Sequence, residues 1–318
     1  MTETVTALET SGLGKRYGRT WGLQDCSFNL PEGRVAALVG PNGSGKSTLL
    51  RMAAGLTRPT AGEIRVLGSS PQHQTVDVLK KVGYLDQERP VYKTLRVEEM
   101  LRFGRSLNPG WDEQSARRYL AELDIPLRSR VGKLSTGQQA QVALTLCLAK
   151  RPELLLLDEP VAALDPLARQ RLMQVLLGSV VDDGTTVLVS SHALSDLEVV
   201  CDYVIILSAS RVQLADDLGH VLATHRLLVG PRRDASTLPE HVQVVAGTHT
   251  DRQSNWLVRV GQPVTDPSLD ALEPTLEEVV VAYLRDQAGS GLANTGTRFA
   301  HGKSREGAPT NNEEVGAR

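Results

Sequence analysis

The segment Gly40-Pro41-Asn42-Gly43-Ser44-Gly45-Lys46-Ser47-Thr48 restricts the fold of this chain more than any other. It follows a short apolar run and precedes the helical run Leu49–Ala54, so it predicts a turn from a buried strand into a helix. Glycines in such a turn let backbone N–H groups face a phosphate, and the helix N-terminus adds its positive dipole end. Lys46 can then reach the outer phosphate oxygens, and Ser47 can bind Mg²⁺. We therefore expect this segment to bind a nucleoside triphosphate together with Mg²⁺.

Short apolar runs alternate with amphipathic ones from Met1 to about Leu218, which indicates an α/β architecture with a largely parallel sheet. Buried strands are expected at Arg34–Val39, Glu153–Leu157, Thr186–Val189 and Tyr203–Leu207. The interval Thr94–Lys150 has no strand pattern. Its apolar residues recur at helical spacing in Val97–Ser106 and Glu113–Leu123, so it is expected to be a helical insertion.

The chain beyond Leu218 is expected to form a smaller α+β unit and a tail. Weaker strand patterns occur at Arg226–Val229, Val242–Ala246 and Trp256–Val260, and a helical pattern at Leu276–Leu284. Residues 287–318 are rich in Gly, Asn, Thr and charge, and cannot bury enough apolar surface to fold alone. We expect a domain at 1–218 with a helical subdomain at about 88–150, an accessory domain at 219–286, and a disordered tail at 287–318.

Composition limits where the protein can work. The formal net charge of −2 gives no general attraction to nucleic acid, so no nucleic-acid partner is expected. The three cysteines lack metal-ligand spacing and fit a reducing compartment. The first ten residues lack the features of a secretory signal, and the apolar runs are shorter than the ~20 residues that span a bilayer. We expect a cytoplasmic protein that needs another chain for work at a membrane.

Two adjacent acids, Asp158 and Glu159, end the strand expected at Glu153–Leu157. Side chains alternate along an extended backbone, so Asp158 can address Mg²⁺ while Glu159 points to where water would attack the γ-phosphate. A strand followed by Asp-Glu-Pro is often only a surface turn, but a phosphate loop in the same chain favours the catalytic interpretation. These two motifs alone also suit a kinase or a GTPase.

The interval between the two motifs separates these possibilities. Leu134-Ser135-Thr136-Gly137-Gln138-Gln139 introduces a helical run, Ala140–Lys150, directly before the acidic strand. It resembles the L-S-G-G-Q signature of the ATP-binding cassette (ABC) ATPases, with Thr136 in place of the usual glycine. A negative φ at Thr136 would make that replacement cost little. The resemblance implies that Ser135, Gly137 and Gln138 bind ATP.

Further residues match functional positions of that family in the right order. The resemblance implies that Tyr17 stacks on adenine, that Gln87 touches Mg²⁺ and the attacking water, and that His192 contacts the γ-phosphate. Asp165 matches the loop that crosses a dimer interface and could equally be a helix N-cap. Asp86 stands where the family usually has proline, which predicts a less stiff hinge before the insertion.

The resemblance also implies an architecture and a mechanism. The fold would be a P-loop NTPase (RecA-like) core with a parallel sheet, an antiparallel β subdomain and the helical insertion. One copy of a homodimer would supply the catalytic Lys46, Glu159, His192 and Gln87 with the metal ligands Ser47, Gln87 and Asp158. The other copy would supply Ser135 and Gly137. The partner would be a separately encoded integral membrane permease, and the protein would lie on the cytoplasmic face of the cell membrane.

Two shorter patterns resemble cassette subunits of exporters, namely Glu273–Leu284 and Asn108–Asp112. They lead us to expect an exporter. The main alternative is a soluble regulatory ABC ATPase that acts on ribosomes or DNA. Such proteins usually have two cassettes or a long coiled-coil insertion, and the sequence shows neither. A kinase or GTPase is disfavoured because no N-K-x-D motif is present and the signature segment would be unexplained.

Overall fold

The computed structural model of the chain describes residues 5–73, 75–88, 91–162, 164, 166–191 and 199–289. A six-stranded sheet with the strand order β5-β6-β7-β3-β8-β9 forms its centre. The strands are β3 (Val35–Val39), β5 (Val82–Leu85), β6 (Leu154–Leu157), β7 (Thr186–Ser191), β8 (Tyr203–Ser208) and β9 (Arg211–Asp217). All neighbours pair in parallel except β8 with the edge strand β9. The predicted strands and their mostly parallel pairing are confirmed.

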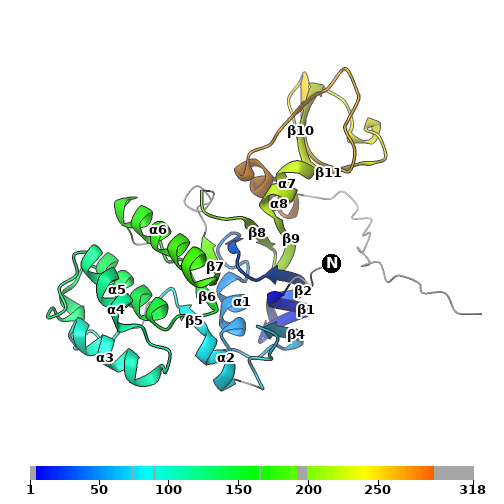
Figure 1. Cartoon of the computed structure of the whole chain (residues 1–318). Coiled ribbons are helices and arrows are strands. Elements are labelled where there is room, and N and C mark those ends of the chain that lie inside the picture. Colours follow the sequence, from blue (N-terminus) through cyan, green and yellow to red (C-terminus); the bar gives the residue numbers. More distant parts are fainter. Residues whose placement is uncertain are drawn as a thin grey trace, which may run out of the picture.

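Both faces of this sheet are covered, which explains its continuous apolar runs. On one face, Ala36 and Leu38 of β3 join a core with helix α1 (Lys46–Ala53) and an antiparallel sheet. On the other face, Val35, Ala37 and Val39 pack with α5 (Thr136–Ala149) and α6 (Pro166–Asp183). Figure 1 shows α1 on one side of the sheet, with α5 and α6 on the other. The alternation of side chains along a strand places neighbouring residues in different cores.

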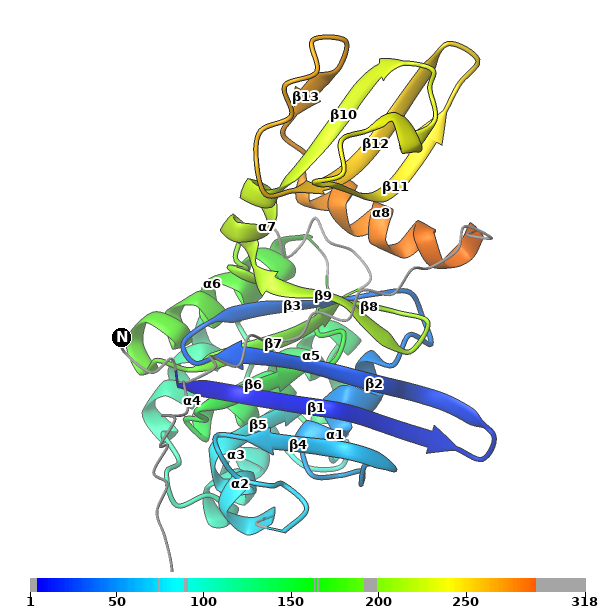
Figure 2. The same ribbon diagram turned by 90° about the vertical axis from the view of Figure 1, so that its right-hand side faces the viewer.

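The antiparallel subdomain that the family resemblance implied is present. Its strands are β1 (Thr6–Tyr17), β2 (Thr20–Pro31) and β4 (Ala61–Val66), in the order β2-β1-β4. The long β1–β2 hairpin turns at Gly18, whose φ of +59° favours glycine. Figure 2 shows these strands extended along one side of the central sheet. The subdomain therefore covers α1 and brings the end of β1 close to the start of that helix.

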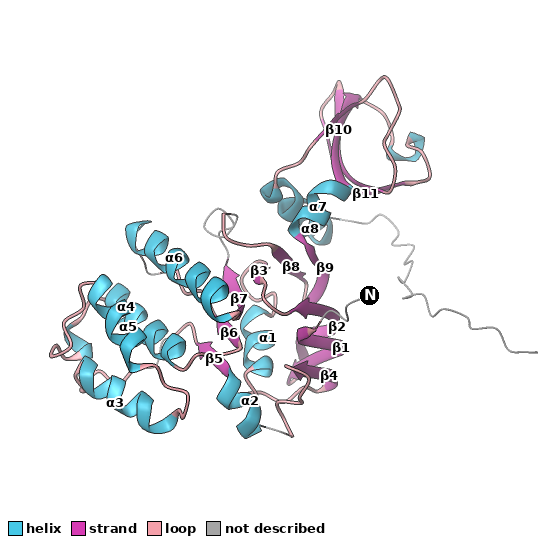
Figure 3. Cartoon of the chain, viewed as in Figure 1, coloured by secondary structure: helices cyan, strands magenta, loops and turns pink. Residues whose placement is uncertain are grey.

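The insertion is helical, as predicted. It contains α3 (Val97–Leu107), α4 (Glu113–Glu122), a 3-10 turn η1 (Val131–Lys133) and α5, while α2 (Thr75–Lys81) precedes β5. The insertion has its own small apolar core, and Figure 3 shows its helices grouped away from the strands. The corner between α3 and α4 is held by Trp111, whose ring fills the space that a Cβ on Gly104 would need. Asp112 accepts a hydrogen bond from Ser115 N at 2.9 Å and so caps α4.

The C-terminal unit contains α7 (Leu218–Thr224), β10 (His225–Pro231), a 3-10 turn η2 (Ala235–Thr237), β11 (Val242–His249), β12 (Gln253–Val260), β13 (Asp270–Leu272) and α8 (Leu276–Gly289). The strands form an antiparallel sheet in the order β11-β12-β10-β13. The three predicted strands and the predicted helix are confirmed. Sequence reasoning missed α7 and also β13, which is three residues long and exposed.

Helix α8 joins this unit to the main core. Its residues Leu276, Val279 and Val280 belong to the same buried cluster as Leu214 of β9 and Leu257 of β12. The boundary expected between residues 218 and 219 therefore falls at the start of α7 and divides a shared core. Helix α8 also includes residues 287–289, which were assigned to the tail, whereas residues 290–318 lie outside the described residues. Among the described residues, no helix combines the length and apolar character needed to cross a bilayer.

The packing of α8 predicts that Leu276→Ala lowers the free energy of unfolding by about 2–5 kcal/mol, because it leaves a cavity in the shared core. Leu272→Ala is the matched control, since that side chain is half exposed and its loss should change the free energy by less than about 0.5 kcal/mol. Urea unfolding of the full chain measures both. Equal midpoints for the two variants would contradict a structural role for the α8 contact.

Candidate nucleotide-binding site

A pocket of about 350 Å³ lies at the carboxyl edge of the central sheet, where α1 begins. It brings together Gly22 and nine of the residues that the sequence nominated, which are Tyr17, Asn42, Gly43, Gly45, Lys46, Ser47, Thr48, Gln87 and Glu159. These residues come from β1 (Thr6–Tyr17), β2 (Thr20–Pro31), the turn before α1, the first turn of α1, the segment after β5 and the end of β6. The pocket therefore unites segments that are far apart in the sequence.

The turn before α1 has a shape that only glycine can adopt at several positions. A Cβ on Gly40 would lie 2.2 Å from Leu207 O, and one on Gly45 would lie 2.3 Å from Gly22 O. Gly45 also has a φ of +109° and forms the N-cap of α1. The bare backbone leaves the N–H groups of this turn and of the helix start able to face an anion. This geometry fits the predicted phosphate loop.

Lys46 is buried at the start of α1, and three oxygen atoms meet its charge. Its Nζ donates hydrogen bonds to Gly40 O at 2.7 Å and to Pro41 O at 3.2 Å, and lies 3.7 Å from Glu159 Oε1. Burial lowers the pKa of Lys46 from its ordinary value, and the carboxylates of Glu159 and Asp158 oppose that shift. The cation is thus fixed at the pocket wall.

The two acids at the end of β6 have different surroundings, since Glu159 lines the pocket and Asp158 does not. Asp158 Oδ1 accepts a hydrogen bond from Ser190 Oγ at 2.7 Å, and the same Ser190 oxygen accepts one from Glu159 N at 2.9 Å. Glu159 has a φ of +50°, a strained conformation for a residue with a side chain, and it lines the pocket. Ser190 on β7 thereby fixes both acids, a role that sequence reasoning missed.

The second oxygen of Asp158 fits a role as a metal ligand. Asp158 Oδ2 is buried and has no hydrogen-bond partner in the part of the chain that the structure describes. A buried carboxylate oxygen without a partner is costly unless a cation or water meets it. Mg²⁺ is commonly bound by one or two side chains together with substrate phosphates and water. Asp158 therefore fits this ion, although it is not among the residues that line the pocket, whereas Ser47 does line it.

Two residues frame the outer part of the pocket. Tyr17 ends β1 with about half of its side chain exposed, and Lys15 Nζ lies 5.4 Å from the centre of its ring. An exposed ring at the pocket rim is available for stacking on a base. Gly22 was missed from the sequence because nothing distinguishes it from other strand glycines. A Cβ there would approach the Tyr17 ring to 3.0 Å and Thr48 Oγ1 to 3.3 Å.

The signature segment lies elsewhere. Ser135, Gly137 and Gln138 are all described, and none of the three lines this pocket. Ser135 is the N-cap of α5, and Gln138 N donates to Ser135 Oγ at 3.2 Å while Ser135 N donates to Gln138 Oε1 at 3.1 Å. Thr136 is the first residue of α5 and has a negative φ, the condition under which threonine was expected to replace glycine at little cost.

His192 and Asp165 lie outside the described residues.

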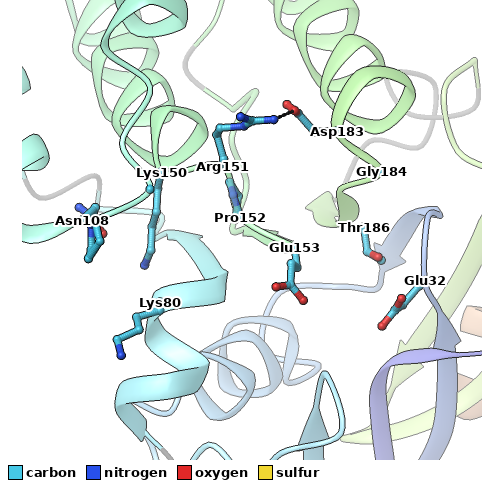
Figure 4. Close-up of a pocket in the computed structure, with 12 residues that line it drawn as sticks. Glu32, Lys80, Asn108, Lys150, Arg151, Pro152, Glu153, Asp183, Gly184 and Thr186 are labelled. Atoms are coloured by element: carbon cyan, nitrogen blue, oxygen red, sulfur yellow. Dashed lines mark hydrogen bonds and ion pairs between the residues drawn. The ribbon is translucent and has the colours of Figure 1, made fainter.

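A second cavity of about 500 Å³ lies at the opposite, amino edge of the sheet (Figure 4). Several of its charged side chains already have partners. Arg151 pairs with Asp183 at 2.8 Å, and Lys150 donates to the carbonyls of Leu79 and Val82. Because Arg151, Asp183 and Lys150 are already bonded, the pocket at the carboxyl edge is the better candidate for chemistry.

Comparisons with known proteins identify the family. The family described as ABC transporter matches residues 23–162. The Nod factor export ATP-binding protein I of Rhizobium johnstonii is 33% identical over 226 residues, which cover 70% of this chain and 72% of that protein. The molybdenum import ATP-binding protein ModC of Rhodobacter capsulatus is 32% identical over 310 residues, which cover 89% of this chain and 85% of that protein.

A solved structure is similar in fold and sequence. It is a dimeric ATP-binding cassette in a post-hydrolysis state, bound to ADP and Pi, and it matches with a TM-score of 0.59 and 26% identity. The match covers 66% of this chain and 98% of that chain. Because the similarity in sequence and fold extends over most of these proteins, the chain belongs to the ABC transporter family and is one of its ATP-binding subunits, which hydrolyse ATP.

Proposed function

We propose that this chain powers a membrane exporter, as a homodimer that ATP holds together on the cytoplasmic face of the membrane beside a separately encoded permease. One observation carries the dimer. The signature residues at the start of α5 do not line the pocket of their own chain, and their helix N-terminus offers the positive dipole end that a γ-phosphate needs. A second copy can bring that end to the open side of the pocket.

The roles of the pocket residues follow from their positions. The N–H groups of Gly40–Thr48 and the ammonium of Lys46 bind the β- and γ-phosphates, and Tyr17 stacks on adenine. Ser47, Asp158 and Gln87 would hold Mg²⁺, which when bound offsets negative charge on the phosphates. Glu159 accepts a hydrogen bond from a water molecule and orients its oxygen toward the γ-phosphorus. The bond between the water oxygen and the γ-phosphorus forms as the bond from that phosphorus to the β–γ bridging oxygen breaks. The water passes a proton to Glu159, and the products are ADP and phosphate.

We infer export from two supports. One is the exporter-like pattern at Glu273–Leu284, and the other is the similarity to the Nod factor export protein. The similarity to a molybdenum import protein shows that the family relationship includes both directions. Transport into inside-out vesicles that contain the permease tests the direction. Uptake driven by ATP supports export, and ATP-driven loss of substrate from such vesicles contradicts it.

The insertion offers a surface for the permease. Tyr92 and Phe103 are 58% and 43% exposed, and their rings meet edge to face at 5.6 Å. Tyr92 follows Gln87 by five residues, so a partner that binds this pair contacts the chain close to a residue of the pocket. Exposed aromatic pairs are typical of protein interfaces. We propose that the permease binds this aromatic pair.

The dimer predicts that Glu159→Gln slows hydrolysis by about 10²-fold or more, since it removes the group that orients water. ATP binding persists, so the variant should accumulate as an ATP-bound dimer in size-exclusion chromatography. Lys46→Ala is the control that should stay monomeric, because its loss removes a phosphate contact. A Glu159→Gln chain that stays monomeric at saturating ATP would count against the shared site.

The permease surface predicts that Tyr92→Ala with Phe103→Ala leaves the ATPase rate of the isolated chain unchanged, because neither side chain lines the pocket. Stimulation of that rate by the reconstituted permease should be lost. Leu56→Ala is a matched control, since Leu56 is similarly exposed. Full stimulation of the double variant, or an equal loss for the control, would exclude this surface.

A further inference from the structure

The segment that links β5 to the insertion is fastened by the side chain of Asp86. Asp86 Oδ2 accepts hydrogen bonds from Arg51 Nη2 at 3.0 Å, Arg51 Nε at 3.3 Å and Tyr84 Oη at 2.9 Å. Asp86 Oδ1 accepts a further one from Glu88 N at 3.0 Å. Only 16% of the Asp86 side chain is exposed. The sequence led us to expect a less stiff hinge here, but hydrogen bonds restrain the segment where a proline ring would otherwise do so.

Both partners of this contact, Arg51 and Asp86, are close in the chain to residues of the nucleotide pocket. Arg51 lies on α1, the helix that begins at Lys46. Asp86 is followed by Gln87, which lines the pocket. Leu85, the residue before Asp86, accepts a hydrogen bond from Asp158 N at 2.9 Å through its carbonyl. The contact thus joins the phosphate-loop helix to the segment that carries Gln87 and braces the metal-binding acid.

The charges at this contact persist near neutral pH. Burial by itself would raise the pKa of Asp86, but its four hydrogen bonds outweigh burial and hold the pKa below its ordinary value. The hydrogen bonds that Arg51 makes with Tyr84 and Asp86 raise the pKa of Arg51 further. Burial raises the pKa of Tyr84, so its hydroxyl remains a neutral donor. Hydrogen bonds between charged partners are stronger and more directional than neutral ones.

We propose that Asp86 is a positioning residue for hydrolysis. Its contact with Arg51 and Tyr84 fixes Gln87 relative to the phosphate loop, and so places the Gln87 amide where it can meet the metal and the attacking water. The proposal rests on the proposed role of Gln87. It also predicts that a displacement of α1 reaches Gln87 directly, because the guanidinium of Arg51 and the carboxylate of Asp86 move together.

The test compares Asp86→Asn with Glu153→Gln in the full chain. Both replace a carboxylate by its amide, and Glu153 forms an ion pair with Lys81 at 3.1 Å at the other end of the paired strands β5 and β6. Asp86→Asn should lower kcat roughly ten-fold while the KM for ATP changes little, since groups that orient a metal site typically contribute 10–100-fold. Glu153→Gln should leave both constants unchanged. Thermal unfolding of each variant verifies that it is folded.

A second comparison separates positioning from general support of the fold. If Asp86 acts through Gln87, Asp86→Asn should cause no further loss of kcat in a Gln87→Ala chain. Tyr84→Phe removes one donor without changing charge and should give a smaller loss that also disappears in that chain. Independent, multiplicative losses from Asp86 and Gln87, or an unchanged kcat for Asp86→Asn, would overturn the proposal. An unchanged kcat for Gln87→Ala would also overturn the proposal for Asp86, but it would not contradict the conclusion that the protein hydrolyses ATP.

Discussion

The buried ammonium group of Lys46 is the constraint on which the site depends. A buried cation costs much free energy unless oxygen atoms meet its charge. Here the carbonyls of Gly40 and Pro41 and the carboxylate of Glu159 do so. Those oxygens can converge only because the central sheet brings the ends of β3 and β6 to one edge, with β7 between them. Ser190 of β7 then bonds both acids and keeps Glu159 facing the lysine.

The sequence predicted the parts of the molecule that depend on local chemistry. Continuous apolar runs located β3, β6, β7 and β8, because strands covered on both faces need no alternation. The glycine turn before α1 and the acids after β6 were recognisable because few residue types allow those functions. The helical run expected at Ala140–Lys150 located most of α5, although the helix begins earlier, at Thr136. Each of these features lies within one short segment.

Features that depend on distant contacts could not be predicted. Ser190 resembles any polar residue at a strand end until the fold places it beside Asp158, 32 residues away. The sequence predicted a less stiff hinge at Asp86, because its bonding partner Arg51 lies 35 residues earlier in the chain and could not be recognised. Likewise, α8 is amphipathic in sequence, but nothing local indicates that it packs against the main core. His192 and Asp165, in contrast, rest on the family resemblance alone.

Helix α5 links the two halves of the proposed catalytic cycle. It begins directly after its N-cap, the signature residue Ser135, and ends beside β5, where the C-cap residue Lys150 donates from Nζ to Val82 O at 2.9 Å. Strand β5 leads into Asp86 and Gln87. The surface offered to a second copy is therefore connected through one rigid helix to the strand that feeds the pocket. In this account, neither the pocket nor the signature can support rapid hydrolysis without the other copy.

The most direct measurement of that claim mixes two inactive chains, Lys46→Ala and Ser135→Ala. In a mixed dimer, one site combines both defects while the other combines the intact Lys46 of one copy with the intact Ser135 of its partner. The account predicts that the mixture hydrolyses ATP although each variant alone does not. A mixture that stays as inactive as its components, despite forming mixed dimers, would contradict a site shared between two copies.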